Sequence, residues 1–355
     1  LGSKAGDNNQ VQALAEALGW PHEEKNLRYR RTELLSNVLM PPNLYGIRRG
    51  AARSLAPPWP ELVISAGRRN EPVARWIKKQ TGGRTRIVHL GRPWASPGAF
   101  DLVVTTPQYR VPPAPNVLLN DLPLHRISRA ALARARTLWA PRLASLPRPR
   151  IAVLIGGHSG PFTFDVDTAR RLGRAVQALA DEMHASVMIS TSRRTPPAAA
   201  AAVHDCLSAP AHTYLWTPAA EHNPYLGYLA VADAVVVTGE SMSMLAEACA
   251  TAKPVYIFDL DGHPVTLPGE TAPDGTSEPR RRFDLNRYRW APLTHRLAMA
   301  LAPSRMQRDV RVLHRKLVES GRAAWLGEAL FEPRPLQVDG DLQRAAARVR
   351  ALFHR

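Results

Sequence analysis

Residues 234–258 read AVVVTGESMSMLAEACATAKPVYIF, and this stretch decides the fold class. It opens with a short apolar run, 234–238, which is typical of a buried strand. A turn of small residues leads into a helical pattern over 241–251, and a second apolar run follows at 254–258. Strand, helix and strand in this order predict a parallel sheet with crossover helices.

The same alternation continues through the rest of the chain. Further strands of the second half are predicted at 151–155, 186–190 and 213–216, with helices at 165–183, 197–207 and 224–231. Strands of the first half are predicted at 62–64, 86–89, 102–105 and 116–119, with helices that begin near Asn9 and at Glu71. The predicted fold class is therefore α/β, with two Rossmann-like parallel-sheet domains.

A proline-rich stretch without periodicity, 140–150, is interpreted as a linker between the two halves. The predicted domains are an N-terminal Rossmann-like domain over 1–145, a C-terminal Rossmann-like domain over 146–295 and a helical segment over 296–355. The stretch 261–292 is rich in Pro, Gly and Arg and predicts a long surface loop. Since a helix near Asn9 normally follows a strand, we expect the first domain to lack its first strand in this sequence.

The chain of 355 residues carries a formal net charge of +17, with 41 arginines against six lysines. Guanidinium groups favour phosphate and carboxylate partners, although a GC-rich genome explains scattered arginines equally well. With aromatic residues at 6% and no recognised nucleic-acid module, nucleic-acid binding is disfavoured. Cys206 and Cys249 lack metal-site or disulfide spacing, so we expect a cytoplasmic protein without a metal site.

Three loops follow predicted strands of the second half, where parallel sheets bind ligands. The first, Gly156–Gly160, brings three glycines to the end of one strand. The second, 190–195, combines hydroxyl groups with Arg193 and Arg194 and suits a phosphate, with a solvated basic turn as the alternative. The third is the turn before 241–251, where Ser241 is expected to cap the helix. For the glycine loop, a simple tight turn is an equal alternative.

The third loop and the Lys-Pro that follows it resemble the donor-site signature of GT-B glycosyltransferases. Together with Gly67–Arg69, Phe100–Val104 and Asn223–Tyr225, it also resembles the mitochondrial fission family named for elongated mitochondria. The resemblance runs from about Gly2 to Phe258, so it covers most of the chain. It implies two Rossmann-like domains that face one another across a cleft.

The resemblance also implies roles for individual residues. Those implied to bind the nucleotide and its phosphates are Gly156, Gly157, Ser192, Arg193, Arg194, Ser241, Met242, Ser243 and Glu247, with Trp216 or Asn223 near the base. In the first domain it implies Asp7 as the catalytic base, with an N-cap of the first helix as the alternative. Asn9, Arg68 and Arg69 are implied on the acceptor side, and His158 is a weaker candidate acid or base.

The leading hypothesis is a metal-independent transfer of a sugar from a nucleotide-sugar donor to an acceptor hydroxyl, without a cofactor. The alternatives are a non-catalytic adaptor that recruits a protein partner in organelle fission, and a nucleotide-sugar epimerase. The acceptor is unknown; an anionic or lipid-linked molecule would suit the charge of the chain. The run Arg280–Arg282 suits peripheral contact with an acidic inner membrane, although a solvated charge run in a loop is the stronger reading.

Overall fold

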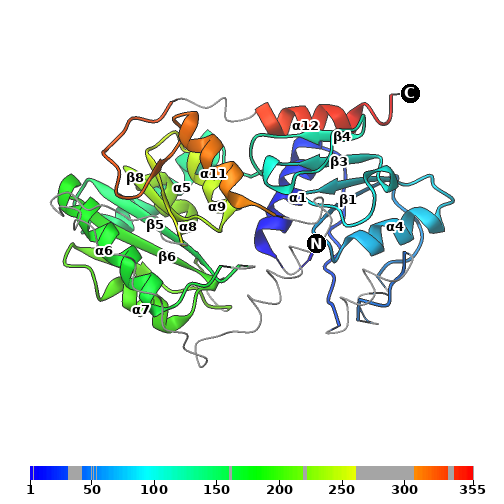
Figure 1. The fold of residues 1–355 in the computed structure, drawn as a ribbon. Helices are drawn as coiled ribbons and strands as arrows, with labels where there is room; N and C mark the ends of the chain where they lie inside the picture. The colour runs from blue at the N-terminus through cyan, green and yellow to red at the C-terminus, as the bar shows by residue number, and fades with distance from the viewer. Residues whose placement is uncertain are drawn as a thin grey trace, which may run out of the picture. The chain divides into compact units, whose positions relative to one another are not determined.

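The structure is a computed structural model. It describes residues 1–2, 4–30, 42–48, 50, 52, 54–159, 162–218, 222–260, 308–334 and 340–354. The chain forms two compact units: the first comprises 1–126, 302–313 and 337–355, and the second comprises 127–301 and 314–336. Each unit contains one parallel sheet (Figure 1).

The sheet of the first unit has four parallel strands in the order β1-β2-β3-β4. The elements of this unit are α1 (Ala5–Leu18), β1 (Leu62–Ala66), α4 (Glu71–Gln80), β2 (Arg86–Leu90), η1 (Pro97–Ala99), β3 (Leu102–Thr105), η2 (Pro107–Tyr109), β4 (Val117–Leu119) and α12 (Gly340–Arg350). Helices α1 and α12 pack on one face of the sheet, through residues such as Leu14 and Val349. Helix α4 covers the other face with Ala74.

The sheet of the second unit has six parallel strands in the order β10-β9-β8-β5-β6-β7. The elements are α5 (Arg129–Trp139), η3 (Pro141–Leu143), β5 (Arg150–Gly157), α6 (Val166–Met183), β6 (Ser186–Arg194), α7 (Pro197–His204), β7 (Ala211–Tyr214), α8 (Tyr225–Val231), β8 (Ala234–Thr238), α9 (Met242–Cys249), β9 (Val255–Phe258), α11 (Val310–Glu319) and β10 (Ala324–Trp325). This is the strand order of the Rossmann fold, in which the chain starts in the middle and winds outward both ways.

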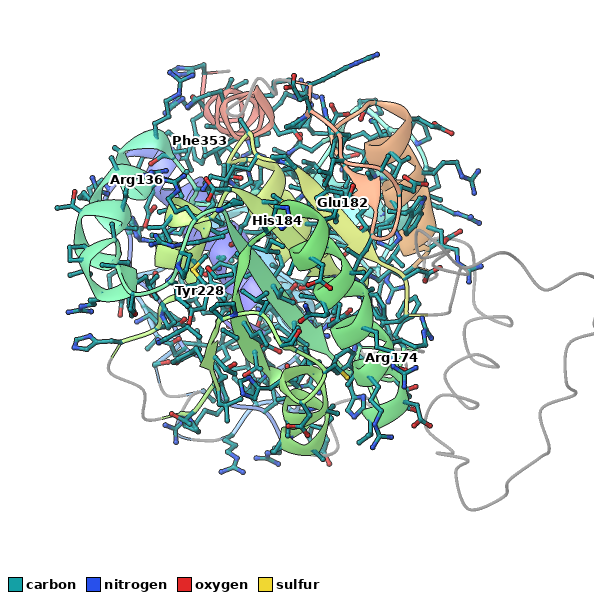
Figure 2. The ribbon with its side chains drawn as sticks, turned by 90° about the vertical axis from the view of Figure 1, so that its left-hand side faces the viewer. Arg136, Arg174, Glu182, His184, Tyr228 and Phe353 are labelled. Carbon is teal, nitrogen blue, oxygen red and sulfur yellow. The ribbon has the colours of Figure 1, made fainter. Side chains whose placement is uncertain are left out.

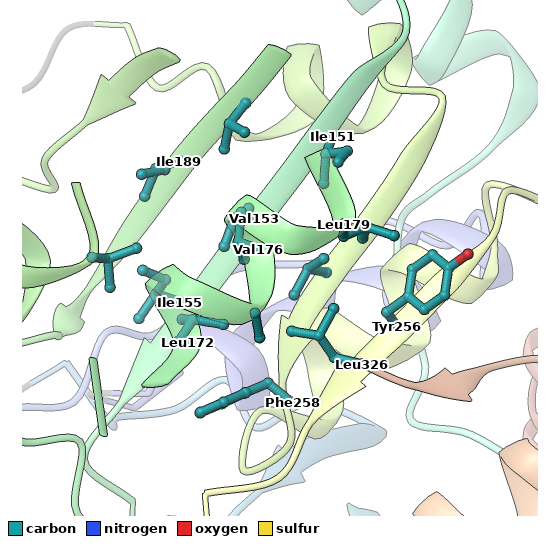
Figure 3. Packing of buried hydrophobic residues seen from close by; sticks show 14 of the residues in the cluster. Ile151, Val153, Ile155, Leu172, Val176, Leu179, Ile189, Tyr256, Phe258 and Leu326 are labelled. Carbon is teal, nitrogen blue, oxygen red and sulfur yellow. The ribbon is translucent and has the colours of Figure 1, made fainter. Parts of the chain in front are cut away.

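One core cluster of the second unit lies between the six-stranded sheet and helices α6 and α7 (Figure 3). Alternate residues of β5, Ile151, Val153 and Ile155, point to this face and are fully buried. Leu172 and Val176 of α6 pack against them, and Asp165 caps the helix by accepting a hydrogen bond from the Thr168 N–H at 2.9 Å. Both faces of β5 are buried, which explains why its sequence is a continuous apolar run.

The strands and helices predicted for 62–119 and 151–258 are confirmed within a few residues at their ends. The first helix begins earlier than predicted, at Ala5 rather than near Asn9, so Asp7 lies in its first turn and is not its N-cap. The whole predicted loop 261–292, including the run Arg280–Arg282, lies outside the described residues. The cleft between the two domains, which the resemblance implies, stays a prediction.

The contacts divide the chain differently from the predicted domain boundaries at 145 and 295. The predicted linker is folded against the second unit, because the buried Arg150 side chain donates hydrogen bonds to the carbonyls of Leu143 and Leu146 at 2.7–3.0 Å. Helix α5, which the sequence reading missed, begins at Ser128, whose hydroxyl accepts from the Ala131 N–H at 3.2 Å.

Helix α5 belongs to the second unit because it packs on α8. The Arg136 guanidinium donates to the Ala230 carbonyl of α8 at 2.6 Å. Figure 2 labels Arg136 and Tyr228, a buried residue of the same helix α8. The predicted helical segment 296–355 also contains a strand, β10, which adds to the edge of the six-stranded sheet beside β9. No helix among the described residues is long and apolar enough to span a membrane.

His89 in β2 is a buried titratable residue of the first unit. Its side chain is completely buried, with Nδ1 3.0 Å from the Ser65 hydroxyl and its ring 5.0 Å from the ring of Phe100. Burial lowers the pKa of His89 from 6.5 to about 4. The folded state therefore holds the neutral imidazole, and protons bind better to the unfolded chain at mildly acidic pH.

We expect the free energy of unfolding to be unaffected by His89 above about pH 6.5 and to fall by about 3 kcal/mol as the pH drops toward 4. Urea unfolding of His89→Gln from pH 4 to 8 should show a shallower loss than the wild-type chain. His354→Gln, at an exposed position of the same unit, is the matched control. An equally steep acid loss in His89→Gln would contradict this assignment.

Candidate functional site

The carboxyl ends of β5 and β8 form the point at which the strand order of the second unit reverses. The chain leaves β5 toward α6 on one face of the sheet, and it leaves β8 toward α9. In open α/β sheets this point is where ligands bind, because the diverging connections leave a crevice. Gly156 and Gly157 end β5 here, and Gly239–Ser241 join β8 to α9.

Gly156 is required by close packing. A Cβ atom at this position would lie 2.0 Å from Glu240 Oε1 and 2.9 Å from the Cβ of Ser241. Gly157 has a φ of 94° and would bring a Cβ to 2.4 Å from the Arg194 carbonyl oxygen. These glycines let three strand ends approach one another, and the ligand-binding role of the loop stays a prediction.

The predicted loop 190–195 is mostly strand, because β6 runs to Arg194, and this carboxyl end of β6 is tied to β5 by hydrogen bonds. The Ser192 hydroxyl donates to the Gly156 carbonyl, and the Thr195 hydroxyl donates to the Ile155 carbonyl at 3.1 Å. Arg194 Nη1 donates to the His158 carbonyl at 2.9 Å. Arg194 is thus half-buried and bonded within the protein, whereas Arg193 is exposed, and the phosphate-binding role of both arginines stays a prediction.

A buried carboxylate, Glu240, lies among these groups. Its side chain is 0% exposed, and Arg194 Nη2 is 3.7 Å from its Oε1. The Thr238 hydroxyl donates to the same oxygen at 3.2 Å and accepts from the Gly156 N–H at 2.8 Å. Because a buried charge requires a partner, Arg194 acts here as the counter-ion of Glu240. The sequence predicts Arg194 at a phosphate or in a solvated basic turn, and neither prediction includes this ion pair.

Helix α9 begins at this edge with Ser241 at its N-cap position. The Ser241 side chain makes no capping hydrogen bond, in contrast to the expectation. Ser241 and Met242 are buried and Ser243 is half-buried. The amides of a first helical turn lack helical acceptors and carry partial positive charge, which suits an anion. The turn before them is fixed by His314, whose Nε2 lies 2.6 Å from the Gly239 carbonyl oxygen.

Glu247 is buried two turns into α9 and is not a solvated helical residue. Its Oε2 accepts a hydrogen bond from the Tyr225 hydroxyl at 2.5 Å. Loss of solvation raises the pKa of Tyr225 well above its ordinary value, and the Glu247 charge acts in the same direction. Tyr225 therefore stays protonated and donates to the carboxylate. Sequence reasoning missed Tyr225, although it follows Asn223-Pro224 in the motif that carries the resemblance.

The two residues expected near the base lie after β7 and before α8. The Trp216 N–H donates to the Thr191 hydroxyl at 2.8 Å, which fixes the half-buried Trp216 beside the end of β6. Asn223 is exposed, and its Oδ1 accepts from the Tyr225 N–H at 2.9 Å at the start of α8. The base-binding role of both residues stays a prediction.

In the first unit, Asp7 and Asn9 lie half-buried on α1, and Arg68 and Arg69 follow β1. A Cβ atom at Gly67 would lie 2.6 Å from Asp7 Oδ2. The Asp7 carboxylate therefore lies directly against the backbone that follows the carboxyl end of β1. Gly67 has a φ of 75°, which glycine adopts without strain. The catalytic and acceptor roles of these residues stay predictions.

Within the part of the chain that the structure describes, no group of three His, Cys, Asp or Glu side chains is arranged to hold a metal ion. A hollow at the amino-terminal edge of the six-stranded sheet is lined by Pro147, His184, Ser186 and Pro210, among others. His184, labelled in Figure 2, ends α6. This hollow lies at the edge opposite to Gly156 and Ser241, and none of the predicted site residues lines it.

The packing around Gly156 leads to a prediction. We expect Gly156→Ala to lower the free energy of unfolding by about 2 kcal/mol or more, because the added methyl group overlaps Glu240 and displaces the Arg194 pair. Urea denaturation at neutral pH measures the change. Gly98→Ala is the control, since the nearest atom that its methyl group would meet lies 3.9 Å away. Equal effects of the two substitutions would contradict the packing assignment.

Among solved structures, the whole chain is similar to UDP-GlcNAc 2-epimerase from Neisseria meningitidis, which was solved bound to UDP-GlcNAc. The TM-score is 0.51 at 13% identity, with 100% of this chain and 98% of that chain covered. At this identity the likeness shows the fold alone: two parallel-sheet α/β domains of the GT-B type, as the sequence predicted.

Two sequence relatives are also similar to the chain. The mitochondrial fission protein ELM1 of Arabidopsis thaliana is 29% identical over 245 residues, which are 63% of this chain. The chain matches 57% of that protein's length. The uncharacterized protein RP120 of Rickettsia prowazekii is 24% identical over 292 residues, covering 72% of this chain and 80% of that protein.

The family model described as mitochondrial fission ELM1 matches residues 5–266. This range begins at α1 and includes β5, β8 and the whole turn into α9, so the match contains the strand ends at which the candidate site lies. It covers well over half of the chain. The chain therefore belongs to the mitochondrial fission ELM1 family.

Proposed function

We propose that this protein binds a nucleoside-diphosphate sugar at the β5–β8 edge of its second unit and transfers the sugar to an acceptor hydroxyl. The observation that carries the proposal is the convergence of Gly156, Ser241 and the amino end of α9 at the point where the strand order reverses. The GT-B fold over the whole chain supports the same class of ligand.

The diphosphate would bind at the first turn of α9, where backbone amides stabilise negative charge. Arg194 is engaged with Glu240, so it contributes positive charge from inside the edge, while the exposed Arg193 is the arginine that reaches a phosphate directly. Glu247 would accept hydrogen bonds from the ribose hydroxyls. Because Tyr225 already donates to Oε2, the remaining acceptor capacity of the carboxylate serves the sugar.

In the transfer, the acceptor oxygen forms a bond to the anomeric carbon while the bond from that carbon to the diphosphate oxygen breaks. The proton of the acceptor hydroxyl goes to Asp7, the proposed general base. Negative charge grows on the leaving diphosphate, and the amino end of α9 stabilises it. Fixed protein charges thus supply the stabilisation that the proposed metal-independent reaction requires.

We expect Glu247→Gln to weaken binding of the preferred nucleoside diphosphate by about tenfold or more, because it removes a charged acceptor. Calorimetric titration with a panel of nucleoside diphosphates and their sugars measures this. Tyr225→Phe removes the same internal hydrogen bond but keeps the carboxylate, so it should bind within about threefold of wild type. Glu182→Gln, at an exposed position on α6, is the charge-matched control (Figure 2).

A folded wild-type chain that binds no member of the panel would contradict the proposed donor site. Equal losses in Glu247→Gln and Tyr225→Phe would show that the carboxylate acts through the fold and does not contact the ligand.

Asp7→Asn tests the transfer step separately. This substitution keeps the size of the side chain beside Gly67 but removes the proton acceptor. We expect donor binding within about twofold of wild type and a loss of transfer of about a hundredfold or more, as for other general bases. Product analysis of the sugar nucleotide with and without acceptor distinguishes transfer from epimerisation. Unchanged turnover in Asp7→Asn would remove Asp7 from the mechanism.

A second candidate function is a non-catalytic adaptor that recruits a protein partner. Two observations favour it: the Arabidopsis relative is named as a mitochondrial fission protein, and Arg194 and Tyr225 already pair with the two carboxylates of the candidate site. If the protein is an adaptor, Glu247→Gln should leave biological activity intact. If it is an enzyme, the same substitution should abolish that activity.

A further inference from the structure

Three arginines lie at the carboxyl edge of the four-stranded sheet in the first unit. Arg68 and Arg69 follow β1, which ends at Ala66, and Arg92 follows β2, which ends at Leu90. The two strands are parallel neighbours in register, with Ala66 opposite Leu90. The three guanidinium groups therefore come from adjacent strand ends of one sheet.

Two more cations come from distant segments of the sequence. Lys4 directly precedes α1, and Arg308 precedes α11. The segment with Arg308 is held to the same edge, because the Asp309 N–H donates to the Gln108 carbonyl at 2.9 Å, just after β3. An ion pair between Arg110 and Asp309, at 2.6 Å, adds to this attachment. Arg68, Arg69, Arg92, Lys4 and Arg308 are called the edge cluster below.

Aromatic rings orient two members of the edge cluster. The Arg68 guanidinium lies over the ring of Trp94, 5.0 Å from its centroid, and the Arg69 guanidinium lies over Tyr29 at 5.6 Å. The π face of an aromatic ring attracts a guanidinium cation and restricts its position. Tyr29 is itself fixed, because its hydroxyl donates to the Asn70 side chain. The arginines are therefore held in place before any ligand binds.

The charges of the edge cluster act on one another. Asp7 raises the pKa of Lys4, but desolvation and the charges of Arg308, Arg68 and Arg69 outweigh it, so that pKa lies below its ordinary value. Burial lowers the pKa of Arg92 to about 10; Tyr109 opposes this shift, and Arg308 and Arg68 add to it. The fold thus holds several cations close enough to repel one another, and a bound anion would relieve this repulsion.

We propose that the edge cluster is a binding site for a phosphate ester. Guanidinium groups bind phosphate oxygens in pairs of parallel hydrogen bonds, and several arginines around one site match the three oxygens of a phosphoryl group. The half-buried positions of Arg68, Arg69, Arg92 and Arg308 leave part of each side chain accessible. Asp7, which acts on Lys4, lies beside this site, so the ligand would present its phosphate to the arginines and a neutral group to Asp7.

If the proposed sugar transfer holds, the neutral group is the acceptor hydroxyl and the edge cluster selects a phosphorylated acceptor. That role rests on the proposed function, whereas binding of a phosphate ester does not. The phosphate is carried either by a soluble molecule or by a lipid headgroup, and the chemistry of recognition is the same for both.

Titration calorimetry of the full chain tests the site, with inorganic phosphate and glycerol 3-phosphate as probes at constant ionic strength. We expect Arg68→Gln/Arg92→Gln to weaken phosphate-ester binding by about tenfold or more. The matched control is Arg84→Gln/Arg344→Gln, which removes the same net charge from exposed positions of the first unit. It should bind within about twofold of wild type. If both double variants weaken phosphate-ester binding equally, the proposal is overturned, because the loss of affinity would then follow from the lower net charge of the chain and not from the edge cluster.

Amide hydrogen exchange gives a second measurement. It uses the wild-type chain, so no substituted chain has to fold. In the wild-type chain, glycerol 3-phosphate should slow amide exchange in 67–70 and 91–95. Slowing elsewhere, with none in these segments, would also overturn the proposal.

Vesicles distinguish the two sources of the phosphate. Binding to phosphatidylcholine vesicles that contain phosphatidic acid, lost in Arg68→Gln/Arg92→Gln, would assign the site to a lipid phosphate. Binding of glycerol 3-phosphate without vesicle binding would assign it to a soluble ester.

Nucleotide titrations separate this proposal from the proposed function. Glu247→Gln should keep the phosphate-ester affinity and lose the nucleotide, and the edge-cluster variant should do the reverse. If the wild-type chain binds glycerol 3-phosphate at the edge cluster but no nucleotide, the proposed function fails and this site stands.

Discussion

The ion pair between Arg194 and the buried carboxylate of Glu240 holds the candidate site together. Arg194 ends β6, Glu240 follows β8, and both lie against Gly156 at the end of β5, so one ion pair connects three strand ends. A buried carboxylate is tolerated only with such a partner. The pair fills the space that a side chain at Gly156 would take, and the Thr238 hydroxyl donates to the Glu240 carboxylate. The pair therefore fixes the edge that would present α9 to a diphosphate.

Arginine has different uses in the two units. In the second unit, Arg150 and Arg136 donate to backbone carbonyls, and Arg194 neutralises a buried carboxylate. In the first unit, the guanidinium groups of Arg68 and Arg69 lie over aromatic rings at the carboxyl end of the sheet. The excess of arginine over lysine thus has structural causes at some positions, because a planar fork with several donors can satisfy two carbonyls or lie flat on a ring.

Membership of the mitochondrial fission ELM1 family and the GT-B fold pose one question about this protein: whether the carboxyl ends of β5 and β8 bind a nucleotide. The edge has two features of a working site, a helix start at the reversal of strand order and a buried carboxylate on that helix. The Tyr225–Glu247 hydrogen bond is compatible with both an enzyme and an adaptor, since a protonated phenol either orients the carboxylate for a ligand or replaces that ligand.

The amino-acid sequence by itself determined the α/β class, the strands and helices over 62–119 and 151–258, and the loops at the carboxyl ends of the strands. These depend on local patterns, such as apolar runs, helix periodicity and glycine turns, which a single segment carries. Helix α5 escaped this reading because its capping Ser128 stands in an arginine-rich stretch that resembles a linker, and only its packing on α8 makes it part of the second unit.

Only the tertiary structure decided the partners of the charged residues. It paired Arg194 with Glu240 and Tyr225 with Glu247, and it brought Arg308 to the edge occupied by Arg68 and Arg92. Residues far apart in sequence come together through strand order and helix packing, and burial then determines which charges must pair. Sequence periodicity does not predict such pairings, because each depends on a single contact between residues far apart in the chain.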